Sequence, residues 1–488
     1  TQSTWGRINR MGPRGLDLFP SLRPPGKTLN FHRYAVLFIT FIAYASFHAS
    51  RKPPSIVKSV LGPEVNHSTT TFSGWAPFNG PRGAPLLGWL DLAFLSTYSV
   101  GMFFAGHAGD RIDVRLLLVS GMAGSGFLTI LFGLAYWLNI HSFSYFVAVQ
   151  LACGALQSIG WPCVITVIGN WFGKEKRGLI MGVWSSNTSM GNVIGSVISS
   201  SVLEFGWGWS FVAAGGLIVA VAALVFFFLV VTPEDLGLQN QIDPNQVEME
   251  EKLRPEAEST RLLSAEKPDA VIAIRFFDAW RLPGVFPFSC CLFFSKLVAY
   301  TFLYWLPFYI RHTAVAGVHI SHKAAGILST VFDVGGIFGG MLAGYASDVL
   351  EARATTSVIF FVLSVPALMC YRLYGRVSMG MNAGLMFASG LLVNGPLALI
   401  TTAVSADLGT QEALRGNARA LATVTAIIDG TGSVGGAIGP LLAGYLSTRG
   451  WNSVFFMLIV SILLATVSLI SVATTELRSK LQKLPSPL

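Results

Sequence analysis

The sequence predicts an all-helical integral membrane protein with about twelve transmembrane helices in two six-helix, pseudo-symmetric halves. Three observations predict it. Of 488 residues, 52% are hydrophobic and 12% are charged, about half the charged fraction of an ordinary globular domain. Apolar runs of about 20 residues, the length that spans a bilayer as a helix, recur along the chain. Short motifs of the first half return in the second half at a constant offset.

The apolar runs fall into two sets on either side of a polar interval. The first set lies near residues 34–52, 86–107, 115–138, 144–168, 178–203 and 209–231. The second set lies near residues 284–310, 324–346, 355–373, 379–404, 418–446 and 453–475. A chain with so many apolar runs cannot cover a water-soluble surface, so most of its solvent must be lipid.

These runs divide the chain into five parts. The parts are an N-terminal tail (1–33), a first six-helix half (34–232), a linker (233–283), a second six-helix half (284–475) and a C-terminal tail (476–488). The linker is acidic, poor in apolar residues and without a period, which is typical of a flexible segment. Its end, "VIAIRFFDAW" at 271–280, has the pattern of a short interfacial helix.

An even number of spans places both termini on one side of the membrane, and the basic residues indicate which side. Lys and Arg gather in both tails and in the loop that contains Lys174, Lys176 and Arg177. The positive-inside rule therefore predicts cytoplasmic termini, and it accounts for the formal charge of +8 without nucleic-acid binding. The loop 53–85 then lies on the opposite side, where the sequon "NHS" predicts glycosylation of Asn66.

Repeated motifs indicate that the two halves are related. "GHAGDRIDVR" follows the second run and "GYASDVLEAR" follows the eighth. At one offset, the matching residues are Gly106, Asp110 and Arg115 with Gly344, Asp348 and Arg353. A second pair, "MGNVIG" and "VGGAIG", occurs late in each half. Parallel repeats of this kind place a substrate site near the bilayer midplane, between the halves.

These motifs carry a resemblance to a known family. "GHAGDRIDVR" is similar to the loop motif of the major facilitator superfamily. "SRKPPSIVKS", "GWPCVITVIGNWFGKEKRG", "YWLPFYI" and "DVGGIFGG" resemble its organophosphate:phosphate antiporter branch, in particular eukaryotic sugar-phosphate exchangers and plant glycerol-3-phosphate permeases. The resemblance covers all the predicted spans. It implies that the loop motifs latch the halves in one conformation, and the gating residues would be Gly106, Asp110, Arg111, Arg115, Asp348 and Arg353.

Arg51 and Lys52 raise the question of depth in the membrane. Tyr44, His48 and Arg51 share one helical face. If the helix continues, Arg51 lies deep in the membrane. If Pro53 ends it, both cations lie near the far interface, where they would snorkel to the headgroups. The resemblance implies that Arg51 binds phosphate, for which a guanidinium offers bidentate, charge-assisted hydrogen bonds. Lys52 would either attract phosphate or snorkel.

The second half should supply another cation. Lys296 is the one basic residue in the seventh run before its far end, with Tyr300 on the same helical face. We expect Lys296 to be the second phosphate ligand, although an interfacial anchor would have the same pattern. Bacterial members of the family carry an arginine where this chain has Ala299, so the geometry of the pocket should differ.

At two further positions this chain lacks a residue with which bacterial members of the family could bind a proton. Where those members have a histidine, this chain offers Asn187 and Thr188, which form hydrogen bonds but do not titrate near neutral pH. Met102 replaces a lysine. His48 is a possible substitute for the missing histidine, or an ordinary hydrogen-bonded one. Strict proton coupling is therefore not expected.

Three acidic residues lie inside predicted spans, where an unpaired charge is costly. Asp91, Asp333 and Asp429 could pair with Arg51 or Lys296, or couple a proton. Alternatively they are structural, because Asp333 and Asp429 precede the glycine runs "GGIFGG" and "GTGSVGG", which favour close helix packing.

The expected function is secondary transport. The sequence has no catalytic motif, no paired metal-ligand spacing and no Walker loop, so no enzyme activity, cofactor, metal or ATP is expected. We expect alternating-access exchange of glycerol-3-phosphate or a sugar phosphate for inorganic phosphate, in the endoplasmic reticulum or plasma membrane. The partners would be these solutes and lipid. Two rivals remain open: a transporter of another anion or a sugar, and a non-transporting organophosphate receptor.

Overall fold

The computed structural model describes residues 28–62, 74–109, 112–172, 184–236, 280–404 and 418–483, with residues 15, 18, 19 and 21 of the N-terminal tail. Across these ranges the chain is helical apart from short turns and caps. Asn66, Asp110, Arg111 and most of the predicted linker lie outside the described residues.

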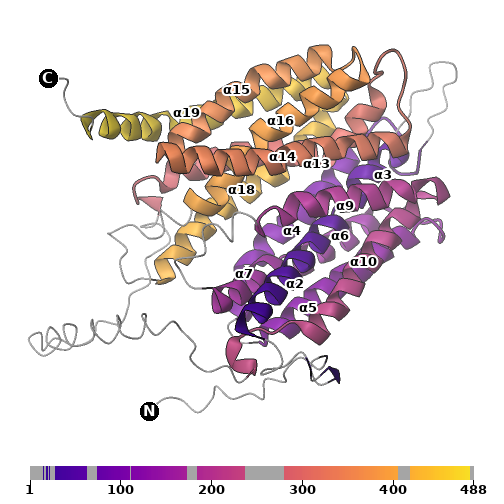
Figure 1. Ribbon diagram of the computed structural model, residues 1–488. Coiled ribbons are helices and arrows are strands. Elements are labelled where there is room, and N and C mark those ends of the chain that lie inside the picture. The colour runs from indigo at the N-terminus through magenta and orange to yellow at the C-terminus, as the bar shows by residue number, and fades with distance from the viewer. Residues whose placement is uncertain are drawn as a thin grey trace, which may run out of the picture.

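The helices form two groups, coloured indigo to magenta and orange to yellow in Figure 1. The first group contains α2 (Leu29–Ser50), α3 (Pro53–Leu61), α4 (Gly83–Gly109), α5 (Val114–Leu134), α6 (Phe143–Gln157), α7 (Gly160–Trp171), α9 (Asn187–Ser201) and α10 (Trp207–Phe228). The second contains α13 (Val285–His312), α14 (His322–Leu350), α15 (Arg353–Tyr374), α16 (Met379–Leu399), α18 (Ala418–Ser447) and α19 (Trp451–Lys483).

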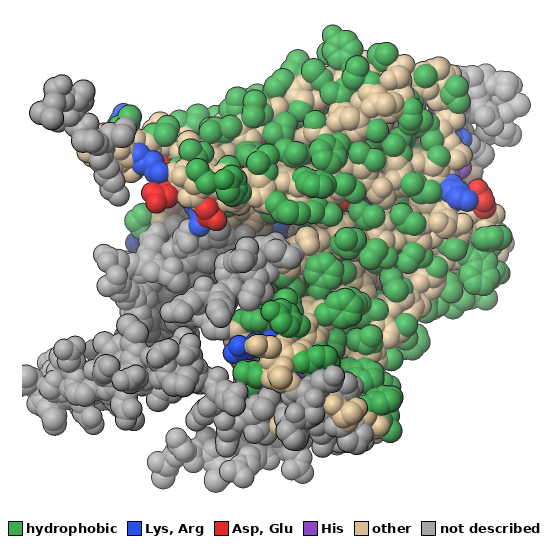
Figure 2. All heavy atoms as spheres, in the orientation of Figure 1, with side chains coloured by type: hydrophobic (Ala, Val, Ile, Leu, Met, Phe, Trp, Pro, Cys, Tyr) green, Lys and Arg blue, Asp and Glu red, His purple; other side chains and the backbone are tan. Residues whose placement is uncertain are grey.

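Each predicted apolar run coincides with one helix or with two consecutive helices. In the described chain, 8 segments are long and apolar enough by themselves to cross a membrane. Hydrophobic side chains cover most of the face seen in Figure 2, and the visible charged side chains lie towards its two ends. Large apolar side chains such as Phe104 (71% exposed) and Phe456 (70% exposed) point outward, as lipid contact requires. The predicted fold class is confirmed.

The first span is broken in its middle. α2 ends at Ser50, and α3 begins at Pro53. Proline ends the preceding helix because its ring clashes with a carbonyl one turn back, yet it suits the first turn of a new helix. The prediction that residues 53–61 belong to a loop was therefore wrong: they form α3. Arg51 and Lys52 consequently lie inside the fold, 5% and 2% exposed, and not at an interface.

The last span also differs from its expected length. α19 continues past residue 475 to Lys483, so the start of the predicted C-terminal tail is helical. At this end Lys480 contacts the α14–α15 connection, where it donates to the carbonyl of Leu350 and lies 3.6 Å from a carboxylate oxygen of Glu351.

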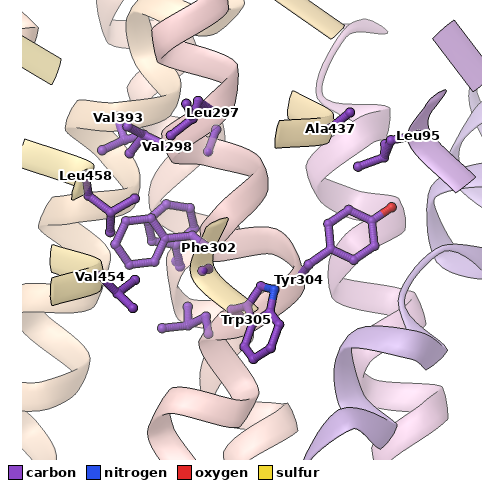
Figure 3. Close-up of a cluster of buried hydrophobic side chains, with 14 of the residues drawn as sticks. Leu95, Leu297, Val298, Phe302, Tyr304, Trp305, Val393, Ala437, Val454 and Leu458 are labelled. Carbon is purple, nitrogen blue, oxygen red and sulfur yellow. The ribbon is translucent and has the colours of Figure 1, made fainter. Parts of the chain in front are cut away.

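We call the side where α2 begins and α19 ends the terminal side, and the other the far side. The two groups share a hydrophobic core towards the far side, where Phe78 and Trp207 of the first group belong to one cluster with Trp305 of the second. Figure 3 shows part of this cluster around α13. The first group's core at the terminal side, which includes Val36 and Trp171, is a separate cluster. Among the described residues, the halves are therefore joined most tightly at the far side.

Glycines bring helices of the second group into close contact. A Cβ added at Gly435 on α18 would overlap the backbone oxygen of Phe293 on α13. One added at Gly339 on α14 would overlap the backbone oxygen of Leu391 on α16. The glycine runs that follow Asp333 and Asp429 are thus packing surfaces, as the sequence predicted.

Candidate functional site

Arg51 is held in the break between α2 and α3 by groups without charge. Its Nε donates to Oε1 of Gln157 on α6 at 2.6 Å. Its guanidinium carbon lies 4.5 Å from the ring centroid of Tyr98 on α4 and 5.8 Å from that of Phe94. Within the described chain, Nη2 is buried without a hydrogen-bond partner. A buried guanidinium with an unused terminal nitrogen is ready to bind an anion.

The three lysines at mid-depth each face a carboxylate. Lys58 Nζ lies 2.7 Å from Oδ1 of Asp91, Lys52 Nζ 3.4 Å from Oδ2 of Asp333, and Lys296 Nζ 2.6 Å from Oδ1 of Asp429. The sequence left open whether these acids pair with Arg51 or Lys296. In the structure one of them pairs with Lys296, and none pairs with Arg51.

A charge count follows from these pairs. Among the described residues at mid-depth, Arg51 and the three lysines carry positive charge, whereas only three carboxylates oppose them. One positive charge is left over, and it belongs to Arg51. A buried charge without a counter-ion costs free energy, so a bound anion would stabilise this arrangement.

Lys296 on α13 is fully occupied. Besides Oδ1 of Asp429, its Nζ lies 3.4 Å from the backbone oxygen of Asp429 and 3.3 Å from Oγ of Ser433, both on α18. An ammonium group has three N–H donors, and here each has an acceptor. Lys296 can therefore contact an anion only after giving up one of these partners.

Tyrosines lie between the two cations. Tyr44 and Tyr98 of the first group and Tyr300 and Tyr304 of the second lie near the guanidinium of Arg51. Tyr300 also lies within electrostatic range of Lys296 and Asp429. Figure 3 shows the ring of Tyr304 directed away from α13, towards the side of Leu95 on α4. These hydroxyls can donate hydrogen bonds to an anion that sits between the halves.

The other predicted site residues lie on α2 and at the start of α9. Tyr44 and His48 on α2 lie together, with ring centroids 5.2 Å apart, beside Arg51. Asn187 and Thr188 lie at the start of α9. There, Asn187 donates to the backbone oxygen of Trp184 at 2.6 Å, and Thr188 donates to Asn187 at 3.2 Å. The structure does not bring this last pair to Arg51.

Four residues of this region were not among the predicted site residues. Asn192, one turn further along α9, donates to Oδ1 of Asp333 at 3.0 Å. Gln157 and Tyr98 contact Arg51 directly. Lys58 lies on α3, which the sequence had assigned to a loop. For Gln157 and Asn192, the available signal was an amide inside an apolar run.

A small cavity lies beside Arg51. Its volume is about 20 Å³, and its polar lining includes Ser50, Asp91 and Gln150. This is room for about one water molecule. Oδ2 of Asp91 is buried without a hydrogen-bond partner in the described chain. Among the described residues, no group of three or more His, Cys, Asp or Glu is placed to hold a metal ion.

The predicted gating residues that the structure describes lie at the terminal side. Arg353 Nη1 donates to Asp348 at 2.6 Å and to Ser347 at 2.7 Å. Arg115 is buried at the start of α5, and Gly106 lies within α4. Glu476 of α19 accepts hydrogen bonds from the backbone N–H groups of Ala354 and Thr355, both at 2.9 Å, at the first turn of α15.

Comparison with known proteins decides the family. The family model described as Major Facilitator Superfamily matches residues 36–418 and 313–487. The chain belongs to the major facilitator superfamily. A solved member of similar fold is a bacterial homolog of the human lysosomal transporter Spinster in an inward-facing, unoccupied conformation. It is 16% identical, with a TM-score of 0.61, and the match covers 94% of this chain and 99% of that one.

Curated relatives within this superfamily are much more similar in sequence. "Putative glycerol-3-phosphate transporter 5" of Arabidopsis thaliana is 63% identical, with 97% of each chain covered. "Putative glycerol-3-phosphate transporter 1" of the same plant is 52% identical, over 94% of this chain and 91% of its own. "Glucose-6-phosphate exchanger SLC37A2" of Danio rerio is 47% identical, over 92% of this chain and 94% of its own. This superfamily member is therefore a multi-pass integral membrane protein.

Proposed function

We propose that this protein exchanges a phosphorylated metabolite for inorganic phosphate by alternating access between its two halves. The observation that carries the proposal is Arg51, whose charge no described carboxylate neutralises and whose terminal nitrogen Nη2 is unused. A phosphate group would supply the missing negative charge, and a guanidinium can bind two phosphate oxygens at once.

The substrate class follows from the relatives. Proteins 63% and 47% identical to this chain are named for glycerol-3-phosphate transport and glucose-6-phosphate exchange. The sole chemical group common to these solutes and inorganic phosphate is the phosphate. We assign that group to Arg51, with Lys52 and Lys296 as further cations that phosphate recruits from their carboxylates. Tyr44, His48 and Tyr300 would line the same space, whereas Asn187 and Thr188 would contact a solute only as it enters or leaves.

Exchange has a physical reason. Closing the halves around an empty pocket buries the uncompensated charge of Arg51, which costs free energy. A bound phosphate neutralises that charge, so the loaded carrier crosses between its two states more readily than the empty one. Entry of one phosphorylated solute is then coupled to exit of another. The loop residues Gly106, Asp110, Arg111, Arg115, Asp348 and Arg353 would hold the terminal side closed in the opposite state.

The membrane and orientation belong to the same proposal. Basic residues of the tails favour cytoplasmic termini, in the endoplasmic reticulum or plasma membrane. Asn66 would then be glycosylated on the far side. Glycosidase treatment tests this proposal: it should shift the band of the wild-type protein on a gel and should not shift that of Asn66→Gln.

The first experiment measures uptake of labelled phosphate into proteoliposomes preloaded with phosphate, glycerol-3-phosphate, glucose-6-phosphate or nothing. We expect uptake only with a preloaded phosphate or phosphorylated solute, and loss of uptake in Arg51→Ala. Arg51→Lys should also lose most activity because a lysine cannot bind two oxygens in a fork. Arg449→Lys, at an exposed loop arginine, is the matched control. Binding of glycerol-3-phosphate without any flux would favour a receptor instead.

A further inference from the structure

Lys296 and Asp429 pose a problem for phosphate binding. Lys296 is the cation of the second half nearest to Tyr300, yet its three donors are all taken by Asp429 and Ser433. Phosphate can reach the ammonium group only by replacing one of these acceptors, and we consider replacement of the charged one, Oδ1 of Asp429 at 2.6 Å. If the carboxylate stayed ionised after that, a buried negative charge would be left beside a dianion. Like charges at short range in a low dielectric repel strongly, so that state is disfavoured.

The net charge of the pocket indicates how the repulsion between Asp429 and a bound phosphate is avoided. The described residues at mid-depth carry one surplus positive charge, that of Arg51. A phosphomonoester dianion would turn this surplus into a deficit of one. Uptake of one proton restores neutrality. Asp429 is the best placed of the three acids to receive it, because its side chain is 25% exposed, against 1% for Asp91 and 9% for Asp333.

We infer that Asp429 occupies Lys296 in the empty carrier and is protonated when a phosphomonoester dianion takes its place. In this step a proton from water adds to a carboxylate oxygen of Asp429. Lys296 then transfers its hydrogen bond from that oxygen to a phosphoryl oxygen. The loaded pocket is neutral, and each dianion is carried together with one proton. The inference rests on the proposed function, and it goes beyond the sequence analysis, which did not expect strict proton coupling.

The surroundings of Asp429 contain few other groups that could take the proton. On α13 the titratable residues that face it are Lys296 and Tyr300, and on α4 Tyr98 lies within range of both. Within the described part of the chain, α18 also packs against α19 and η5 (Ile400–Val404). No residue of η5 titrates, and those of α19 begin at Glu476, near its terminal-side end. Lysine and tyrosine are already protonated at neutral pH, which leaves Asp429.

The test is proton uptake on binding of glycerol-3-phosphate to the purified full-length protein in nanodiscs at about pH 8. At this pH the phosphomonoester is already a dianion, because its second pKa is about 6. Titration calorimetry in buffers of different ionisation enthalpy counts the protons taken up by the complex. Infrared difference spectra report the carbonyl stretch of a newly protonated carboxyl group. We expect about one proton per ligand and a new carboxyl band.

Variants identify the residue that takes up the proton. Asp429→Asn should bind the ligand with about no proton uptake and no band, because the variant pocket already has the charge to balance a dianion. The charge-neutral pair Lys58→Gln with Asp91→Asn, which removes an ion pair with a less exposed acid and leaves the surplus charge unchanged, should keep both signals. If Asp429→Asn folds poorly, the neutral pair Lys296→Gln with Asp429→Asn provides the same infrared comparison.

The outcomes separate this inference from the proposed function. Ligand binding with equal proton uptake in wild type and Asp429→Asn would overturn the inference and leave the exchanger intact. Proton uptake without a carboxyl band would place the proton on the ligand or on His48 and would also overturn it. A folded wild-type protein that binds no glycerol-3-phosphate and no phosphate would refute the proposed function itself, and the inference with it.

Discussion

Lys52 and Asp333 join the two halves of the molecule at mid-depth, with Nζ 3.4 Å from Oδ2 and both side chains buried. Asn192 of the first half donates to the other carboxylate oxygen at 3.0 Å. Asp333 on α14 is thus held by two residues from the opposite half. Any motion that separates α14 from α9 must break these contacts and expose the partners to water or to a substrate.

The stability of this link can be measured with a double-mutant cycle. Asp333→Asn and Lys52→Gln should each lower the free energy of unfolding by about 3–5 kcal/mol, since each leaves an uncompensated buried charge. The double variant should lose less than the sum, because neither charge then remains. Thermal unfolding in detergent reports the difference. The exposed pair Lys323–Glu204, 3.3 Å apart across the same interface, is the control and should show almost no coupling. If the double variant lost as much free energy of unfolding as the two single variants together, Lys52 and Asp333 would not be coupled.

A carboxylate placed beside Arg51 should block phosphate. Gln157→Glu puts a negative charge at the atom that accepts from Nε at 2.6 Å, and so supplies the missing counter-ion. We expect the affinity for phosphate to fall at least about tenfold, the effect of roughly 1.4 kcal/mol. Gln157→Met, which removes the hydrogen bond without adding charge, should have a smaller effect. Calorimetry measures the phosphate affinity of both variants and so shows which substitution weakens binding more. Unchanged affinity in Gln157→Glu would exclude Arg51 as the phosphate ligand.

Asn192 and Thr188 should differ in their effects on transport. Asn192→Ala removes a partner of Asp333 in the pocket, so we expect the exchange rate to fall several-fold. Thr188→Val removes a hydroxyl that bonds only its neighbour Asn187 among the described residues, so we expect exchange to stay within about twofold of wild type. Phosphate exchange in proteoliposomes compares the two. A larger loss in Thr188→Val would mean that the start of α9 contacts the solute.

Close helix packing at Gly339 should be sensitive to one methyl group. Gly339→Ala drives a Cβ into the backbone oxygen of Leu391, so α14 and α16 must move apart. We expect a loss of about 1–3 kcal/mol in the free energy of unfolding, typical of overpacking. Gly344→Ala on the same helix meets nothing within 4 Å and should be neutral or slightly stabilising. Equal shifts in melting temperature for the two variants would contradict the packing seen here.

Helices were predictable because their signal is local. A run of about 20 apolar residues is sufficient for a span, so the twelve runs and their order came from the sequence. The break at Pro53 was harder, since proline ends one helix and begins another equally well. The packing of α3 against α13, which the sequence does not reveal, shows that the residues after Pro53 form a second helix inside the fold.

Partners within the site were not predictable because they depend on tertiary contacts. Lys52 and Asp333 are 281 positions apart, and Lys296 and Asp429 are 133 apart. An acidic residue inside a predicted span indicates that it has a partner, but it does not indicate which residue that partner is. The sequence located Arg51 and Lys296. It did not indicate that the first has neutral neighbours while the second is already engaged.

The break in the first span lets one stretch of chain contact both halves. α2 packs within its own half, against α9 and α10, whereas the nine-residue α3 lies against α13 of the other half as well as against α9 and α10. Lys58 ties α3 to its own half through Asp91 at 2.7 Å, and Lys52, just before α3, reaches Asp333 of the other half at 3.4 Å. The residues on either side of Pro53 thus form a connection between the two bundles that a continuous helix could not make.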